Sequence, residues 1–97
     1  MRFSLFTQVM GHSNHIRIME YFLEGRELDF DVMQIAEDTE LSRKTVQKVI
    51  DSLIGSKIIF INRRVGRTYL FKLNKDNQIS KRLCKLFDEI LQKEGED

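Results

Sequence analysis

Four polar side chains in the stretch Leu41–Leu53, LSRKTVQKVIDSL, can each donate several hydrogen bonds: Arg43, Lys44, Gln47 and Lys48. A guanidinium, two ammonium groups and an amide can bind phosphates, carbonyl oxygens and ring nitrogens. The apolar residues of the stretch recur at helical spacing, so the polar groups share the opposite side, with Arg43 at its edge. This pattern allows two interpretations, a solvated helix face or a surface that binds nucleic acid.

The expected start of this helix carries two hydroxyl residues, Ser42 and Thr45. Ser42 is a good N-cap, and the free N–H groups and dipole of a first helical turn favour phosphate. An α-helix fits the major groove, where Arg and Lys can donate to guanine and Gln can pair with adenine. The carboxylate of Asp51 fits a solvated face better, because phosphates repel it. The predicted contacts are Ser42 and Thr45 to the DNA backbone, Arg43 to a base or a phosphate, and Lys44, Gln47 and Lys48 to base edges.

A second group of cations lies further along the chain, between two segments with strand character. KIIFIN (Lys57–Asn62) and TYLFKL (Thr68–Leu73) are rich in β-branched and aromatic residues, and they predict a β-hairpin with the five-residue loop RRVGR. Gly66 is available there for a positive φ. A minor groove or a row of phosphates would neutralise the charge of this loop. Its cations are Arg63, Arg64 and Arg67, with no acid nearby in the sequence.

The net charge of +1 over 97 residues conceals a strong segregation of charge. Residues 1–40 contain 3 basic and 8 acidic residues, whereas residues 41–75 contain 9 basic residues and a single acid, Asp51. Residues 76–97 contain 4 basic and 6 acidic residues. Such asymmetry predicts a basic patch on an acidic body. The alternative is that the two kinds of segment neutralise each other in the fold.

Three further helices are predicted from hydrophobic periodicity and capping residues. Asn14–Glu24 follows the N-cap Ser13, is apolar around most of its circumference and is expected to lie in the core. Val32–Thr39 begins with an Asp–Gln capping pattern, and Asn77–Glu94 carries a broad apolar arc. The segment Phe3–Met10 is predicted to be a short helix or strand, and ELDF at residues 27–30 is a possible edge strand. Glycines at helix ends predict a left-handed C-cap at Gly25 and, at Gly55, the end of the helix that begins after Ser42.

Two helices joined by a tight corner, with a hairpin directly after the second, form a winged helix-turn-helix arrangement. The runs QIAEDTELSRKTVQKVIDSLIGSKII and RRVGRTYLFKL resemble the DNA-binding core of prokaryotic winged-helix regulators of the ArsR and MarR type. The upstream HIRIMEYFLEG is similar to their first core helix, and the resemblance covers Gly11–Leu73. One residue departs from the family pattern. Glu40 stands at the corner, where the family usually has Gly or Asn in a left-handed conformation.

We therefore expect a mainly α fold with a small β-hairpin, in one domain of residues 1–97 with its core in 11–75 and a C-terminal helix at 77–94. The resemblance implies a homodimeric transcriptional regulator that binds specific double-stranded DNA, with the third helix in the major groove and the hairpin on the backbone or minor groove. In the resembled families, terminal helices mediate dimerisation. The candidate interface residues are Ile79, Leu83, Leu86, Phe87, Ile90 and Leu91.

Other functions find little support in the sequence. No nucleophile–base pair, paired carboxylates or phosphate-binding glycine loop is present, so we expect no catalysis and no cofactor. His12 and His15 have H-x-x-H spacing without a further local ligand, and no metal site is predicted. The single Cys84 and the absence of a signal-like or membrane-spanning run favour a cytoplasmic protein. The remaining alternatives are a winged-helix module that binds an acidic protein and a DNA binder in replication or plasmid maintenance.

Overall fold

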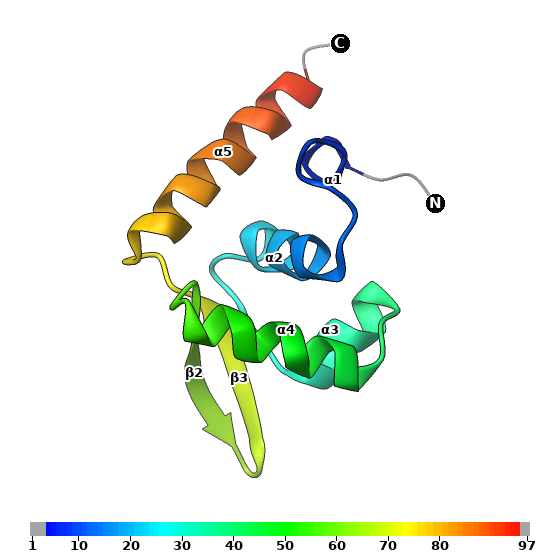
Figure 1. The fold of residues 1–97 in the computed structure, drawn as a ribbon. Coiled ribbons are helices and arrows are strands. Elements are labelled where there is room, and N and C mark those ends of the chain that lie inside the picture. The colour runs from blue at the N-terminus through cyan, green and yellow to red at the C-terminus, as the bar shows by residue number, and fades with distance from the viewer. Residues whose placement is uncertain (1–3, 96–97) are drawn as a thin grey trace.

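The computed structural model describes residues 4–95, which form five helices and one three-stranded antiparallel sheet (Figure 1). The sequence predicted a mainly helical chain with a hairpin, and the sheet adds the possible edge strand as a third strand. The chain is therefore a small α+β arrangement. Its elements are α1 (Leu5–Met10), α2 (Asn14–Glu24), β1 (Asp29–Phe30), α3 (Val32–Thr39), α4 (Arg43–Gly55), β2 (Ile59–Val65), β3 (Thr68–Leu73) and α5 (Gln78–Glu94).

Helix α2 is the centre of the molecule, as its apolar circumference predicted. The Ser13 hydroxyl accepts a hydrogen bond from the backbone N of Ile16 at 3.1 Å and starts the helix. Ile18, Phe22 and Leu23 are completely buried. Helices α1 and α5 lie on one side of α2, and α3 and α4 lie on the other (Figure 1). Burial of this helix on both sides joins the two halves of the chain around one core.

The corner between α3 and α4 is tight and left-handed. Glu40 has φ 60° and ψ 28°, a conformation that costs a non-glycine residue about 1–2 kcal/mol. Arg17 on α2 supports this corner, because its guanidinium donates a hydrogen bond to the backbone oxygen of Thr39 at 2.6 Å. A cation at the carbonyl end of α3 also interacts favourably with the helix dipole. Glu40 thus adopts a left-handed backbone conformation although it is not a glycine.

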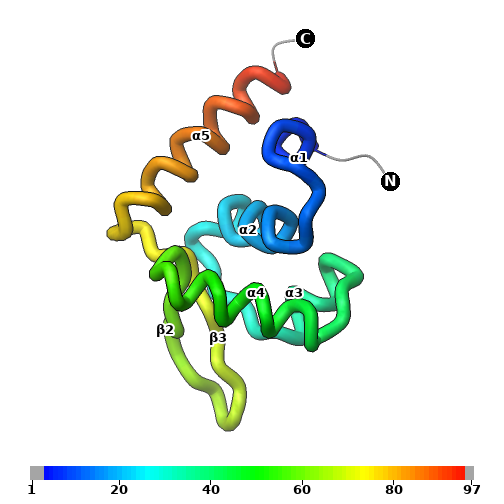
Figure 2. Tube along the Cα trace, in the orientation of Figure 1, coloured from blue at the N-terminus to red at the C-terminus, as the bar shows by residue number. Residues whose placement is uncertain are grey.

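The sheet has the strand order β1-β3-β2, and the β2–β3 hairpin projects away from the helices (Figure 2). Side chains alternate between the two faces of a strand, so Tyr69, Phe71 and Leu73 share one face. Phe71 and Leu73 are buried against the helices. We call this side the inner face of the sheet and the opposite side the outer face.

The segment expected as a short helix or strand is a helix, α1, and Phe3 lies outside the described residues. Phe6 is buried and contacts the ring of Phe87 on α5 edge-to-face, with 5.4 Å between ring centroids. The carboxylate of Glu20 on α2 accepts hydrogen bonds from the hydroxyls of Ser4 at 2.5 Å and Thr7 at 2.7 Å. An apolar contact and a polar one therefore attach α1 to two neighbouring helices.

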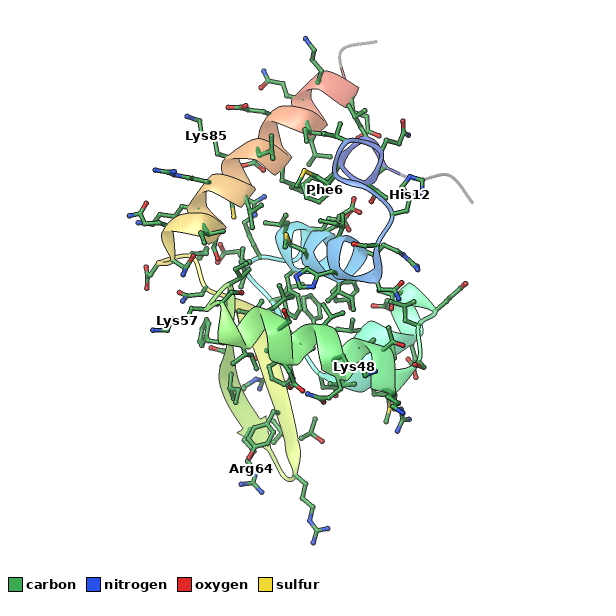
Figure 3. All side chains as sticks on the ribbon, in the orientation of Figure 1. Phe6, His12, Lys48, Lys57, Arg64 and Lys85 are labelled. Atoms are coloured by element: carbon green, nitrogen blue, oxygen red, sulfur yellow. The ribbon has the colours of Figure 1, made fainter. Side chains whose placement is uncertain are left out.

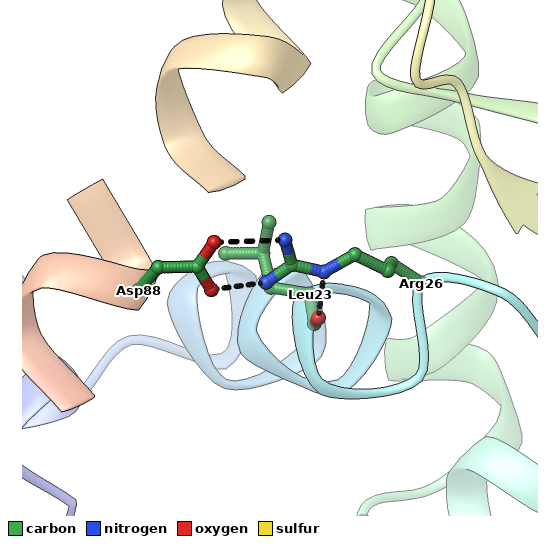
Figure 4. A network of polar contacts seen from close by, with 3 residues as sticks. All are labelled: Leu23, Arg26 and Asp88. Carbon is green, nitrogen blue, oxygen red and sulfur yellow. Dashed lines mark hydrogen bonds and ion pairs between the residues drawn. The ribbon is translucent and has the colours of Figure 1, made fainter. Parts of the chain in front are cut away.

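Helix α5 is held on the core by an ion pair. Arg26, just after α2, donates two hydrogen bonds to the carboxylate of Asp88 at 2.8 and 3.2 Å and a third to the backbone oxygen of Leu23 (Figure 4). The carboxylate raises the pKa of the Arg26 guanidinium, which also lies over the ring of Phe87.

None of the helices within residues 4–95 has the length and apolar character needed to cross a lipid bilayer.

Of the two helix-end glycines, Gly25 differs from the sequence prediction, whereas α4 ends at Gly55 as predicted. Gly25 has φ −102°, so its expected left-handed conformation is wrong. A Cβ at Gly25 would lie 2.5 Å from Cζ of the Phe30 ring, and this close approach explains the absence of a side chain. Gly55 is still helical, and the left-handed residue after α4 is Lys57 with φ 64°.

These surroundings predict opposite effects of the same substitution. Gly25→Ala should destabilise the fold by about 1–3 kcal/mol, because the ring of Phe30 packs against Tyr21 and Phe22 and has little room to move. Gly55→Ala should stabilise it by about 0.5–1 kcal/mol, since no atom lies within 4 Å of a Cβ there and alanine favours the helix. Urea denaturation followed by circular dichroism checks both values. Equal effects of the two substitutions would contradict this explanation.

Candidate nucleic-acid interface

Helix α4 exposes the polar face that the sequence predicted. Val46, Ile50 and Leu53 are completely buried against the core, which turns the opposite side of the helix to solvent. The four predicted hydrogen-bond donors are exposed there, and Figure 3 shows Lys48 among them, on the helix above the hairpin. They are Arg43, Lys44, Gln47 and Lys48.

The first turn of α4 is capped as expected. The hydroxyl oxygen of Ser42 accepts a hydrogen bond from the backbone N of Thr45 at 3.1 Å, and it donates one to the Thr45 hydroxyl at 2.9 Å. Ser42 is exposed, whereas Thr45 is half-buried. Because the first N–H groups of a helix have no intrahelical acceptor, this turn still offers donors to an anion.

The predicted five-residue hairpin loop is wrong. Strand β2 continues to Val65, which pairs with Thr68, so only Gly66 and Arg67 form the loop. Gly66 has φ +61°, and glycine at the first of two loop positions is the preference of type II′ turns. The turn matches the twist of the strands, which allows pairing to extend to the tip. The arginines before it therefore belong to a strand rather than to a loop.

A β-bulge decides on which face of the sheet each of these arginines lies. Ile61 pairs with Phe71 and Arg63 pairs with Leu70, so Asn62 is an extra residue in β2. Paired residues share a face of the sheet. Arg63 therefore lies on the outer face with Leu70, and the next residue, Arg64, lies on the inner face. Without the bulge the two arginines would exchange faces.

The outer arginine is bound within the chain. The Arg63 guanidinium donates to both carboxylate oxygens of Asp29 on β1, at 2.7 and 3.2 Å, and the Asn62 side chain donates to the same carboxylate at 2.9 Å. These two partners hold the pKa of Asp29 below its usual range, the arginine having the larger effect. The sequence analysis found no acidic residue close to Arg63 along the chain, but the fold brings Asp29 beside it. Arg63 connects β2 to β1 and is less available to an external phosphate than the other two.

The ion pair predicts a pH-dependent contribution to stability. The folded-state pKa of Asp29 is lowered, so the pair stabilises the fold above the usual carboxyl pKa, and this contribution is lost as the pH falls through the lowered value. The urea midpoint of Asp29→Asn should therefore lie below that of the unmodified chain at pH 6, and the gap should narrow as the pH falls below the usual carboxyl pKa. Asp76→Asn is the matched control, since the Asp76 carboxylate has no hydrogen bond or ion pair within residues 4–95. A constant gap between pH 6 and 3 would contradict the assignment.

Arg64, on the inner face, is held in place by contacts within the hairpin, but part of its guanidinium can still donate hydrogen bonds. Arg64 lies opposite Tyr69, and its guanidinium carbon is 5.5 Å from the centroid of that ring. Its Nε donates to the backbone oxygen of Gly66 at 2.7 Å, which leaves the two terminal nitrogens for another acceptor. Figure 3 shows Arg64 near the tip of the hairpin. Tyr69 thus supports the hairpin.

Helix α4 and the hairpin border a common hollow of ≈ 270 Å³. Arg43 and Gln47 line it from α4, and Arg67 and Tyr69 line it from the hairpin. The start of α3 contributes the remaining wall, which includes the apolar Met33. Asp31, the N-cap residue of α3, also lines the hollow, so one acidic residue lies beside its two arginines. The two segments that the sequence selected for their cations therefore meet at one concave surface.

The cations around this hollow are available for binding. Within residues 4–95, Arg43, Lys44, Lys48 and Arg67 form no hydrogen bond or ion pair. Four other cations are bound elsewhere in the chain, namely Arg17, Arg26, Arg63 and Lys75. We use the term basic surface for the exposed polar residues of α4 and the two inner or terminal arginines of the hairpin. These are Arg43, Lys44, Gln47, Lys48, Arg64 and Arg67.

The six apolar residues proposed for a dimer interface on α5 divide into two groups. Phe87 and Ile90 are buried in the core of their own chain, and Leu83 is partly buried against it. The other three remain exposed, with exposed fractions of 54% for Ile79, 37% for Leu86 and 46% for Leu91. The apolar arc of α5 is thus wide because it includes both core and surface positions, and the exposed positions form the part available to a second copy.

Sequence reasoning missed two residues that shape the site, Asp29 and Asn62. An aspartate within a possible edge strand gave no signal of a bond to an arginine 34 positions later. An asparagine between a β-branched run and two arginines was a weak signal for a bulge, because asparagine is uncommon within strands. No protein-family model and no curated protein sequence matches the chain.

Proposed function

We propose that this chain is a winged helix-turn-helix protein that binds specific double-stranded DNA sequences as a homodimeric transcriptional regulator. The observation that carries the proposal is the basic surface, of which Arg43 and Gln47 on α4 and Arg67 on the hairpin border one hollow. The resemblance of the sequence to ArsR- and MarR-type regulators supports the same function. In this proposal α4 enters the major groove and the hairpin is the wing.

The composition of the basic surface suits a duplex better than a general anion. A major groove is about 12 Å wide and admits one helix, and its base edges present acceptors to cations and a donor–acceptor pair to an amide. Gln47 is the only amide of the basic surface, whereas its cations can bind phosphates or guanine. The hairpin tip reaches beyond the helices, so Arg64 and Arg67 can contact the backbone or minor groove beside the helix (Figure 1).

A two-fold dimer would place two copies of α4 at half-sites about 34–36 Å apart. The exposed apolar residues Ile79, Leu86 and Leu91 on α5 are the proposed contact. Helix α5 lies on the side of α2 opposite to α3 and α4 (Figure 1). A contact there would leave the basic surfaces of both copies free.

Selection of duplexes from a random library by the purified chain tests the function directly. We expect an enriched palindrome with half-sites about 10 base pairs apart, which reports specificity and two-fold symmetry together. Heparin, a polyanion without base edges, serves as the control ligand. If the chain retains heparin and duplexes equally and enriches no sequence, it recognises charge alone. That result would favour a module that binds an acidic protein.

A further inference from the structure

Two side chains on the exposed face of α4 are joined to each other. The side-chain Nε2 of Gln47 donates a hydrogen bond to Oδ1 of Asp51, one helical turn away, at 2.9 Å. Beyond the N-cap contact of Ser42, this is the only hydrogen bond between α4 side chains in the described part of the chain. Both residues are exposed, and Gln47 also lines the hollow beside the hairpin. The bond therefore acts on a residue of the basic surface.

The chemistry of the carboxylate decides which way the amide points. An ionised carboxylate can only accept hydrogen bonds, so Asp51 attracts the NH2 group of Gln47 and repels its carbonyl oxygen. One N–H is used in this bond, and the second N–H and Oε1 remain free. A glutamine with no such neighbour can turn its amide over, because rotation about its terminal torsion exchanges the two ends.

The free donor and acceptor of Gln47 complement one purine better than the other. Adenine presents the acceptor N7 next to the donor N6 in the major groove, whereas guanine presents the two acceptors N7 and O6. A glutamine amide can satisfy both groups of adenine, but against guanine its Oε1 would face O6. Fixing the amide removes the rotation that would have to be restricted on binding.

We infer that Asp51 is a positioning residue that holds the Gln47 amide for adenine and thereby sets the preference at one base pair of each half-site. This inference rests on the proposed function. It assigns Asp51 a role within the basic surface even though its charge opposes phosphate binding. Asp51 therefore raises the preference for adenine and lowers the overall affinity for DNA.

Asp51→Asn separates the two effects. Asparagine has nearly the same shape but offers both a donor and an acceptor, so the Gln47 amide is no longer held in one orientation. A bidentate contact discriminates by about 5- to 150-fold, and we expect the adenine enrichment at one selected position to fall toward parity. Affinity for an unrelated duplex should rise about threefold at low salt, because one like charge is removed. Glu37→Gln on α3 is the matched control, since it removes one charge from a side chain without a partner in residues 4–95 and should leave the preference unchanged.

The same substitution in a Gln47→Ala background tests whether Asp51 acts through the amide. There Asp51→Asn should change no base preference, because the group that it positions is absent. A preference for cytosine that survives Gln47→Ala and is lost with Asp51→Asn would overturn the inference, since Asp51 would then contact a base itself. Retention of the adenine enrichment by the single Asp51→Asn variant would also overturn it.

A measurement without DNA tests the hydrogen bond itself. The side-chain amide resonances of Gln47 in the free protein should move in Asp51→Asn and stay in place in Glu37→Gln. Unchanged resonances in Asp51→Asn would overturn the inference while leaving the proposed function intact. Failure of the unmodified chain to enrich any duplex is a failure of the proposed function, and it is seen before any variant is tested.

Discussion

Replacing Arg64 and Arg67 together with glutamine should lower the affinity for duplex DNA by about two to three orders of magnitude at about 0.1 M salt. Each phosphate contact releases a condensed counterion, and the logarithm of affinity falls with the logarithm of salt by about 0.9 per contact. Two contacts in each copy of a dimer make four, so the slope should become shallower by about 3.6. Because the contacts are to the backbone, the loss should be similar for all sequences.

The matched control removes the same charge elsewhere. Lys81 and Lys85 are exposed on α5, away from the hairpin, and the Lys81→Gln, Lys85→Gln variant should keep the salt slope of the parent. Fluorescence anisotropy of a labelled duplex between 50 and 200 mM salt measures both variants. If the two double variants lose affinity equally, net charge rather than the position of the hairpin arginines determines binding. A slope near zero for the parent would oppose binding through phosphates altogether.

Phe87→Ala should destabilise the fold by about 3–5 kcal/mol, the usual range for removing a buried aromatic ring. The Phe87 side chain is 2% exposed, contacts Phe6 on α1 and lies beneath the guanidinium of Arg26. Its loss therefore leaves a cavity where α1, α2 and α5 meet. A chain of this size has a total stability of only about 5–15 kcal/mol, so the effect should be visible as a large shift of the urea midpoint.

The neighbouring residue on α5 provides the contrast. Leu86 is 37% exposed, and Leu86→Ala should destabilise a monomer by less than about 1 kcal/mol while weakening a dimer formed through α5. Sedimentation velocity over a range of concentrations measures the second effect. If Phe87→Ala is tolerated and Leu86→Ala unfolds the chain, then Leu86 rather than Phe87 lies on the buried face of α5. If Leu86→Ala leaves the oligomeric state unchanged, the proposed dimer surface lies elsewhere.

The helices could be predicted from the sequence because capping residues and hydrophobic periodicity lie within a few residues of one another. Ser13 and Asp31 cap α2 and α3 as predicted, and the bounds Asn14–Glu24 and Val32–Thr39 are confirmed. Strand β3 is confirmed over Thr68–Leu73, where Phe71 and Leu73 are buried and Lys72 between them is only partly buried. The exposed side of α4 was also predictable, because its buried stripe fixes the opposite face.

The geometry of the hairpin was not accessible in this way. A glycine two residues before a strand is compatible with a loop of two residues or of five, and only the pairing of Val65 with Thr68 distinguishes them. The bulge at Asn62 is visible only in the pairing of β2 with β3, and the acceptor Asp29 lies on a third strand, β1, which precedes α3 in the chain. The roles of Arg63 and Arg64 therefore follow from contacts between residues distant in sequence.

The sequence by itself determined the helices, the cations and the strong asymmetry of charge, because each depends on residue type and short-range periodicity. The tertiary structure alone decided which cations are free. It bound Arg63 to Asp29, placed Arg64 over Tyr69 and brought Arg67 to the hollow beside Gln47. The physical reason is that a one-residue shift in strand register reverses the face of every following side chain, and the balance of contacts that sets register spans the whole fold.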